Sequence, residues 1–130
     1  MDRLFLDANI LFSAAYREGS PLLRLWNPSG PELLTSAYAI EEARRNLASD
    51  VQRERLEQIV ARLRIVPENP APPEEALQLR AKDAPILAAA VAGGATHLLT
   101  LDRKDFGKFF GTRLAGVLIL HPRDYSVPGS

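Results

Sequence analysis

Two short apolar runs that each lead into an aspartate constrain this chain more than any other feature. Residues 4–6 (Leu-Phe-Leu) are followed directly by Asp7, and residues 97–101 lead into Asp102. Short, nearly continuous apolar runs are typical of strands that are buried on both faces of a parallel sheet. Ligands of such sheets bind beyond the carboxyl ends of the strands. The pattern therefore places both acids at the edge where a ligand site is expected.

The segments between these runs predict helices that alternate with strands. Helices are expected at residues 8–16, 21–26, 36–47, 50–63, 74–81 and 84–93, and further strands at 32–35, 64–67 and 118–120. Residues 67–73 hold four prolines and are expected to form a loop. This alternation favours an α/β fold, a three-layer α/β/α sandwich around a central, mainly parallel sheet of about five strands. No repeat or internal boundary divides the sequence, so we expect a single domain over residues 1–130.

Composition limits the kinds of site that the chain can form. It has 130 residues and no cysteine, which excludes disulfides and thiolate ligands and leaves oxygen or imidazole for any metal. Sixteen basic residues balance sixteen acidic ones, which argues mildly against nucleic-acid binding unless bound cations offset several acids. We expect neither a signal peptide nor a membrane span, and hence a cytoplasmic protein without a membrane partner.

A third acid, Asp83, begins the predicted helix that leads into the strand before Asp102. Each of these acids also has a purely structural interpretation: Asp7 and Asp83 suit helix N-caps, and Asp102 suits the cap of a turn. Several carboxylates at one edge repel one another unless a cation lies between them. The set therefore predicts Mg²⁺ or Mn²⁺, because both ions prefer hard oxygen ligands. Such an ion activates water and stabilises charge on a phosphate group.

The same residues resemble four motifs of the PIN-domain family of nucleases, which includes the toxin components of VapBC-like toxin–antitoxin pairs. The matching segments are 6–11, 35–47, 82–90 and 100–106. In these motifs the acids are Asp7, Glu42, Asp83 and Asp102 in chain order, with Glu41 as the less favoured choice in the second motif. The resemblance extends over residues 4–125, and the four motifs occur in order at family-like spacing.

The resemblance implies a metal-dependent endoribonuclease, a hydrolase of RNA phosphodiester bonds that uses Mg²⁺ or Mn²⁺. It implies that Asp7, Glu42, Asp83 and Asp102 are at once the catalytic residues and the metal ligands. In this hypothesis Glu42 either completes the ligand shell or orients the attacking water. The residues expected to support them are Asn9 and Thr100, through hydrogen bonds to the acids, and Asp105, as a further carboxylate that could bind a second ion.

Cations near the acids are candidates for contacts with RNA phosphates, with solvated surface as the alternative. These candidates are Arg44, Arg45, Arg103 and Lys104. Lys82 stands where some family members carry an additional acid; we interpret it as a solvated helix end, with a phosphate contact as the alternative. The resemblance further implies an RNA substrate, an antitoxin protein as partner, and a homodimer. The apolar segment 22–26 is the candidate surface for a protein contact.

Two other functions stay open. One is a catalytically silent PIN-fold module that binds RNA or protein. The other is a phosphatase that forms an aspartyl-phosphate on Asp7, although such enzymes typically carry a second acid two residues later, where this chain has Asn9. Absence of metal binding in calorimetry would favour the silent module, and a trapped aspartyl-phosphate would favour the phosphatase.

Overall fold

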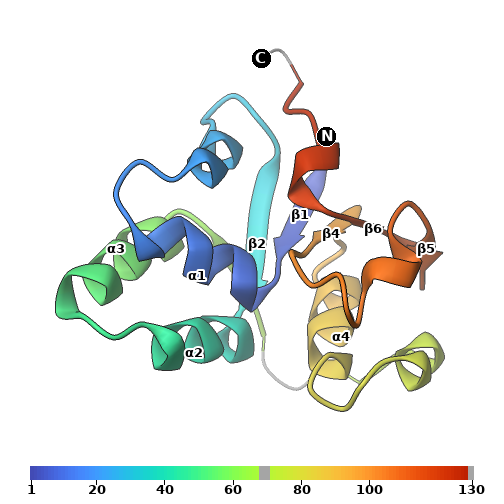
Figure 1. The fold of residues 1–130 in the computed structure, drawn as a ribbon. Helices are drawn as coiled ribbons and strands as arrows, with labels where there is room; N and C mark the ends of the chain where they lie inside the picture. Colours follow the sequence, from blue (N-terminus) through green and yellow to red (C-terminus); the bar gives the residue numbers. More distant parts are fainter. Residues whose placement is uncertain (68–70, 129–130) are drawn as a thin grey trace.

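A six-stranded sheet forms the centre of the molecule (Figure 1). The computed structural model describes residues 1–67 and 71–128. Its strands are β1 (Arg3–Leu6), β2 (Glu32–Ser36), β3 (Arg64–Val66), β4 (His97–Leu99), β5 (Arg113–Leu114) and β6 (Val117–Leu120). They lie in the order β3-β2-β1-β4-β6-β5, and all neighbours are parallel except β5 and β6.

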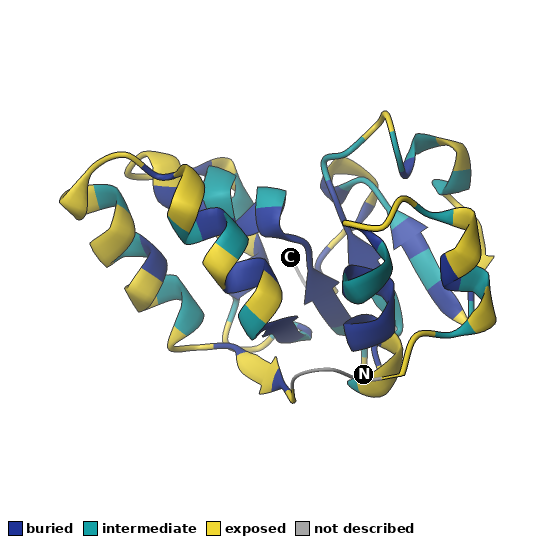
Figure 2. Cartoon of the chain, turned by 90° about the horizontal axis from the view of Figure 1, so that it is seen from below, coloured by how far each residue is buried: buried dark blue, intermediate teal, exposed yellow. Residues whose placement is uncertain are grey.

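Helices cover both faces of this sheet. The α-helices are α1 (Ala8–Tyr16), α2 (Ala37–Asn46), α3 (Asp50–Val60) and α4 (Ala84–Ala92), and the short 3₁₀ helices are η1 (Pro21–Trp26), η2 (Glu74–Gln78), η3 (Gly107–Phe109) and η4 (Pro122–Asp124). Helices α1, α2 and α3 pack on one another, whereas α4 packs on β2, β3 and β4 (Figure 1). The buried strands lie between these two groups in Figure 2. The predicted α/β sandwich is therefore confirmed.

Burial on both faces of the sheet explains why the strand sequences are apolar. Leu4, Phe5 and Leu6 of β1 are all fully buried, because helices cover the sheet on either side. Helix α4 is buried along residues 86–90, where alanines allow it to lie close to the sheet. Helix α3 is different: most of its residues face solvent, and Ser49 begins it with a capping box.

The strand order turns at β1, and this turn fixes where a site can form. From β1 the chain builds outward through β2 and β3, then returns to the other side of β1 as β4 and continues to β6. Parallel pairing aligns Leu6 with Leu99, and the Asp7 amide donates to the Leu99 carbonyl at 3.1 Å. In doubly wound sheets the crevice at such a reversal is the usual ligand site.

Several predicted elements differ from the observed ones. The sheet has a sixth strand, β5, whose two residues are too few to show an apolar pattern. The helices expected at 21–26 and 74–81 are 3₁₀ turns, and the second ends at Gln78. The helix expected at 50–63 ends at Val60. Of the proline-rich loop expected at 67–73, residues 68–70 lie outside the described part of the chain.

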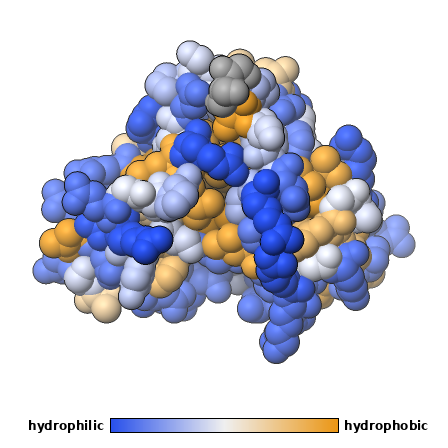
Figure 3. All heavy atoms as spheres, turned by 45° about the horizontal axis from the view of Figure 1, so that its top comes forward, coloured by the Kyte–Doolittle hydropathy of each residue, from blue (hydrophilic) through white to orange (hydrophobic). Residues whose placement is uncertain are grey.

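In the apolar segment 22–26, which the sequence offered as a candidate surface for a protein contact, Leu23 is exposed and Leu22 is partly buried. Leu25 and Trp26 are buried, and the Trp26 indole donates to the Ile59 carbonyl at 3.0 Å. On the face that carries both termini, hydrophobic and hydrophilic side chains are interspersed (Figure 3). Within residues 1–67 and 71–128, no helix combines the length and the apolar character needed to cross a membrane.

Gly93, directly after α4, lies close to the side chains of β2 and β3 and provides a test of this packing. A Cβ atom there would lie 2.6 Å from both Leu34 Cδ1 and Val66 Cγ2, and both side chains are fully buried. We expect Gly93→Ala to lower the free energy of unfolding by about 1–3 kcal/mol in urea titrations, because a filled core must shift. Gly107→Ala is the control, because its Cβ would lie 3.8 Å from the nearest side chain. Equal effects of the two substitutions would contradict the packing.

Candidate active site

Asp7 follows β1 and has hydrogen bonds to both of its carboxylate oxygens. Oδ1 accepts from the Ala8 amide at 2.7 Å, and Oδ2 accepts from the Thr100 hydroxyl at 2.8 Å and more weakly from Asn9 Nδ2 at 3.4 Å. The side chain is almost fully buried. Asp7 thus caps α1, as its structural interpretation requires, and lines a cavity at the same time.

Asn9 and Thr100 connect α1 to the segment after β4. The Thr100 hydroxyl, which donates to Asp7, accepts from Asn9 Nδ2 at 3.1 Å and from the Asp102 amide at 3.1 Å, so its hydrogen-bonding capacity is used in full. The Asn9 side-chain oxygen accepts from the Leu101 amide at 2.9 Å. These bonds fix the orientation of Asp7 and the position of Asp102. They suit the supporting role expected of Asn9 and Thr100.

Asp83 and Asp102 use their carboxylates in different ways. Asp83 begins α4, but its side chain makes no capping bond, and its buried Oδ2 has no hydrogen-bond partner among the described residues. The capping interpretation of Asp83 is therefore wrong. Asp102 Oδ1 accepts from the amides of Lys104 and Asp105 at 3.0 and 2.9 Å, so it does cap its turn.

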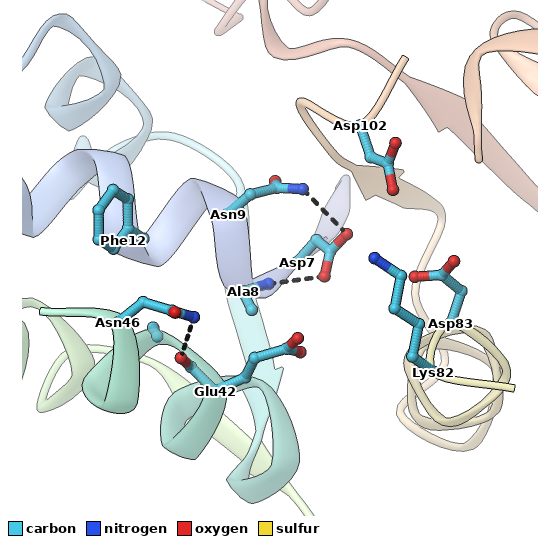
Figure 4. Close-up of a pocket in the computed structure, with 10 residues that line it drawn as sticks. Asp7, Ala8, Asn9, Phe12, Glu42, Asn46, Lys82, Asp83 and Asp102 are labelled. Carbon is cyan, nitrogen blue, oxygen red and sulfur yellow. Dashed lines mark hydrogen bonds between the residues drawn. The ribbon is translucent and has the colours of Figure 1, made fainter. Parts of the chain in front are cut away.

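A cavity of about 400 Å³ brings four acids together at the carboxyl edge of the sheet (Figure 4). The acids that line it are Asp7, which follows β1, Glu42 of α2, Asp83, which precedes α4, and Asp102 in the segment after β4. Glu42 projects from α2 toward Asp7 in Figure 4. Glu41, the alternative acid in the sequence, does not line the cavity and instead pairs with Arg44 at 2.8 Å on the surface. The fold thus places at one site the four acids that the motifs named.

The buried acids are costly to ionise. Burial raises the pKa of Asp7 from 3.8 to about 6; the Thr100 hydroxyl opposes this shift and the charge of Glu42 adds to it. Burial likewise raises the pKa of Asp83 to about 6, with Lys82 as the opposing charge. Removal from water and mutual repulsion therefore both disfavour the ionised cluster, and a bound cation would relieve both.

A donor set for a hard cation is present. Among the described residues, carboxylate oxygens of Asp83, Asp102 and Asp105 lie within 4.8 Å of one another. The unpartnered Oδ2 of Asp83 supplies a free ligand atom. Oxygen ligands of this kind fit Mg²⁺ or Mn²⁺. Asp105, which the sequence placed in a supporting role, therefore belongs to this donor set, although its carboxylate also lies 3.5 Å from Arg80 and 3.6 Å from Lys82.

The four predicted phosphate-contacting cations differ in their surroundings. Arg44 is held by two acids, Glu41 at 2.8 Å and Glu57 at 2.7 Å. Arg45 lines a separate groove between α2 and α4. Arg103 and Lys104 are exposed beside Asp102. Lys82, interpreted as a solvated helix end, lines the acidic cavity, so that interpretation is incomplete.

Three residues at or beside the site were not identified from the sequence. Asn46 and Phe12 line the cavity, and Asn46 donates to the Glu42 carbonyl at 2.8 Å. Helical spacing would have found Asn46, because it lies one turn after Glu42. Tyr38 donates from its hydroxyl to the Lys82 carbonyl at 3.0 Å and so fastens α2 to the start of α4. No local pattern signals this long-range contact.

A doubly wound α/β fold with acids gathered where the strand order reverses defines the class of this protein. A family model described as PIN domain matches residues 3–104, more than half of the chain. The chain therefore belongs to the PIN-domain family, and the resemblance seen in its motifs is confirmed.

Solved structures with this fold include two from bacteria. A chain of VapBC2 from Rickettsia felis, solved bound to a DNA fragment from their promoter, is 15% identical with a TM-score of 0.63, over 92% of this chain and 98% of that one. VapC20 from Mycobacterium tuberculosis, described as a sarcin-ricin loop cleaving toxin, is 15% identical with a TM-score of 0.50, over 78% of this chain and 91% of that one. At this identity they show a shared fold. No curated protein matches the sequence.

The raised pKa of Asp7 predicts an unusual dependence of stability on pH. Between pH 3.8 and about pH 6, Asp7 keeps a proton in the folded chain that it releases in the unfolded chain. The stability from this group is complete below 3.8 and is lost as the pH rises through about 6. In EDTA at about pH 7.5 we expect Asp7→Asn to melt roughly 5–10 °C above the parent, and at about pH 3 to melt with it, measured by calorimetry. A variant that melts lower at both pH values would contradict the buried charge.

Proposed function

We propose that this chain is a metal-dependent endoribonuclease that hydrolyses RNA phosphodiester bonds. The observation that carries the proposal is the cavity where Asp7, Glu42, Asp83 and Asp102 meet, with one oxygen of Asp83 left unpartnered. Such a cluster costs free energy in an empty protein, which is the pattern expected of a site built for a cation. A Mg²⁺ or Mn²⁺ ion there would activate water and stabilise negative charge on the phosphate.

The residues of the chain would divide the remaining tasks. Asp7, Asp83 and Asp102 would hold the ion, directly or through water. Thr100 keeps Asp7 oriented through its 2.8 Å hydrogen bond, and Asn9 links this pair to the backbone after β4. Glu42, which reaches the cavity from α2, completes the ligand shell or orients the attacking water.

RNA would approach over the cations around the cavity. Arg103 and Lys104 are exposed beside Asp102, and Arg45 is exposed on α2, so each is free to meet a phosphate. Arg44 would have to exchange its ion pairs with Glu41 and Glu57 to do so. Phosphate contacts of this kind make binding weaken as salt rises.

We further propose that the chain acts as a toxin in the cytoplasm, under the control of an antitoxin, and that it forms a homodimer. Two solved structures that share the fold support this proposal: one is VapBC2 bound to a DNA fragment from their promoter, and the other is VapC20, a sarcin-ricin loop cleaving toxin. The shared fold and the complete set of acids support the proposal. The phosphatase alternative gains no support, because Asn9 is held by Thr100 and Leu101 in place of a second acid.

RNA cleavage by purified protein with Mn²⁺, Mg²⁺ or EDTA tests the activity. We expect metal-dependent cutting that falls by about 100-fold or more in Asp7→Asn and Asp102→Asn, because each removes a charged ligand. Asp124→Asn is the matched control, since Asp124 is exposed on η4 outside the cavity. Cutting that survives both active-site substitutions would point to a contaminating nuclease and contradict the site. Bound metal without any cutting would favour the silent binding module.

Growth of a bacterial host tests the toxin role separately. Induced expression of the parent chain and of Asp124→Asn should arrest growth, while Asp102→Asn at equal protein level should not, because it lacks a ligand of the site. Growth that continues with all three proteins would contradict the toxin role and leave the ribonuclease proposal to the cleavage assay.

A further inference from the structure

Lys82 is the one cation among the ten described residues that line the acidic cavity. Its side chain is half exposed, and its Nζ lies 3.6 Å from Asp105 Oδ2. Figure 4 shows the ammonium group extended toward the carboxylates of Asp7, Asp83 and Asp102. The Tyr38 hydroxyl, bonded to the Lys82 carbonyl at 3.0 Å, fixes the backbone from which this side chain extends.

Lys82 contacts Asp105 directly and shares the cavity lining with the four other acids. Asp105 contacts two cations, Arg80 and Lys82, and its pKa is lowered because these charges outweigh the effect of burial. The four acids that line the cavity have Lys82 as their single cationic neighbour in that lining. A divalent ion among those four acids would repel the ammonium group. The Lys82 side chain is half exposed, so it has room to turn away from the ion.

We propose that Lys82 is a phosphate-binding residue of this site and that it supplies the positive charge that a second divalent ion would otherwise provide. In the free protein its ammonium group lies against Asp105. With one divalent ion among the cavity acids and a phosphodiester in place, the ammonium group donates to a non-bridging phosphate oxygen. The inference rests on the proposed ribonuclease function and deepens it, because it names the group that recognises the scissile phosphate.

Two measurements should move in opposite directions when Lys82 loses its charge. Lys82→Gln leaves the cavity acids without a cationic neighbour, so Mn²⁺ should bind about three- to tenfold more tightly in calorimetry. The same variant should cleave RNA about 10- to 100-fold more slowly at saturating Mn²⁺, because the phosphate loses a donor. If Lys82 only stabilised the fold through Asp105, Lys82→Gln would lower the melting temperature without both tightening Mn²⁺ binding and slowing cleavage.

Matched variants separate charge from shape. Lys82→Arg keeps the positive charge, so Mn²⁺ affinity should stay near that of the parent and a substantial part of the cleavage should remain. Lys108→Gln is the control for removing a lysine charge, because Lys108 lies over the Phe109 ring and does not line the cavity. It should leave both measurements unchanged.

The outcomes that overturn the inference differ from those that overturn the ribonuclease. A Lys82→Gln variant that cuts as fast as the parent, or binds Mn²⁺ no more tightly, overturns it, as does a parent that binds two Mn²⁺ ions per chain. If the parent binds Mn²⁺ but cuts no RNA, the ribonuclease proposal fails. The role of Lys82 is then decided by measuring how tightly the Mn²⁺-loaded proteins bind a labelled RNA oligonucleotide, by fluorescence anisotropy. Weaker binding by Lys82→Gln then supports the phosphate contact, and equal binding overturns it. A parent that binds no Mn²⁺ overturns both.

Discussion

Leu6 and Leu99 face each other across the parallel pairing of β1 with β4, and this register carries Asp7 and Thr100 to the same edge of the sheet. The hydroxyl of Thr100 meets Asp7 only because the two strands end at the same level. Helix α1 begins at this edge, and the segment that holds Asp102 leaves from it. The position of each remaining part of the site follows from this pair, since α2 and α4 bring their acids to the same crevice.

The site is built at the expense of the stability of the empty chain. Asp7 and Asp83 are nearly excluded from water, their pKa values are raised, and one oxygen of Asp83 makes no hydrogen bond within the described structure. A core optimised for stability alone would carry asparagine or an apolar residue at these positions. Local conflict of this kind is expected where function overrides stability.

Patterns along the chain were sufficient to predict the α/β sandwich and the three aspartates at its edge, because apolar runs and helix starts are local features, whereas Glu42 was predicted only from the resemblance to a family motif. Glu42 could be separated from Glu41 by its place in the motif, and the structure puts Glu42 in the cavity and Glu41 on the surface. Strand β6 was predicted from the sequence, but its partner β5 was not, since two residues leave no periodic signal.

Long-range contacts between side chains could not be predicted in this way. The bond from Tyr38 to Lys82 joins residues 44 positions apart, and the approach of Lys82 to Asp105 depends on how two loops meet. A lysine before a helix is commonly solvated, and only the packed structure shows that this one extends into an acidic cavity.

The order in which the acids occur along the chain has a consequence for synthesis. Thr100 bonds to Asp7 across 93 positions, and Asp102 and Asp105 follow later still. A chain that emerges from its amino end therefore exposes Asp7 and Glu42 long before the strand that completes their site exists. Pairings this distant in sequence form late and slowly. A nascent chain thus has no assembled acid cluster until most of the domain has been made.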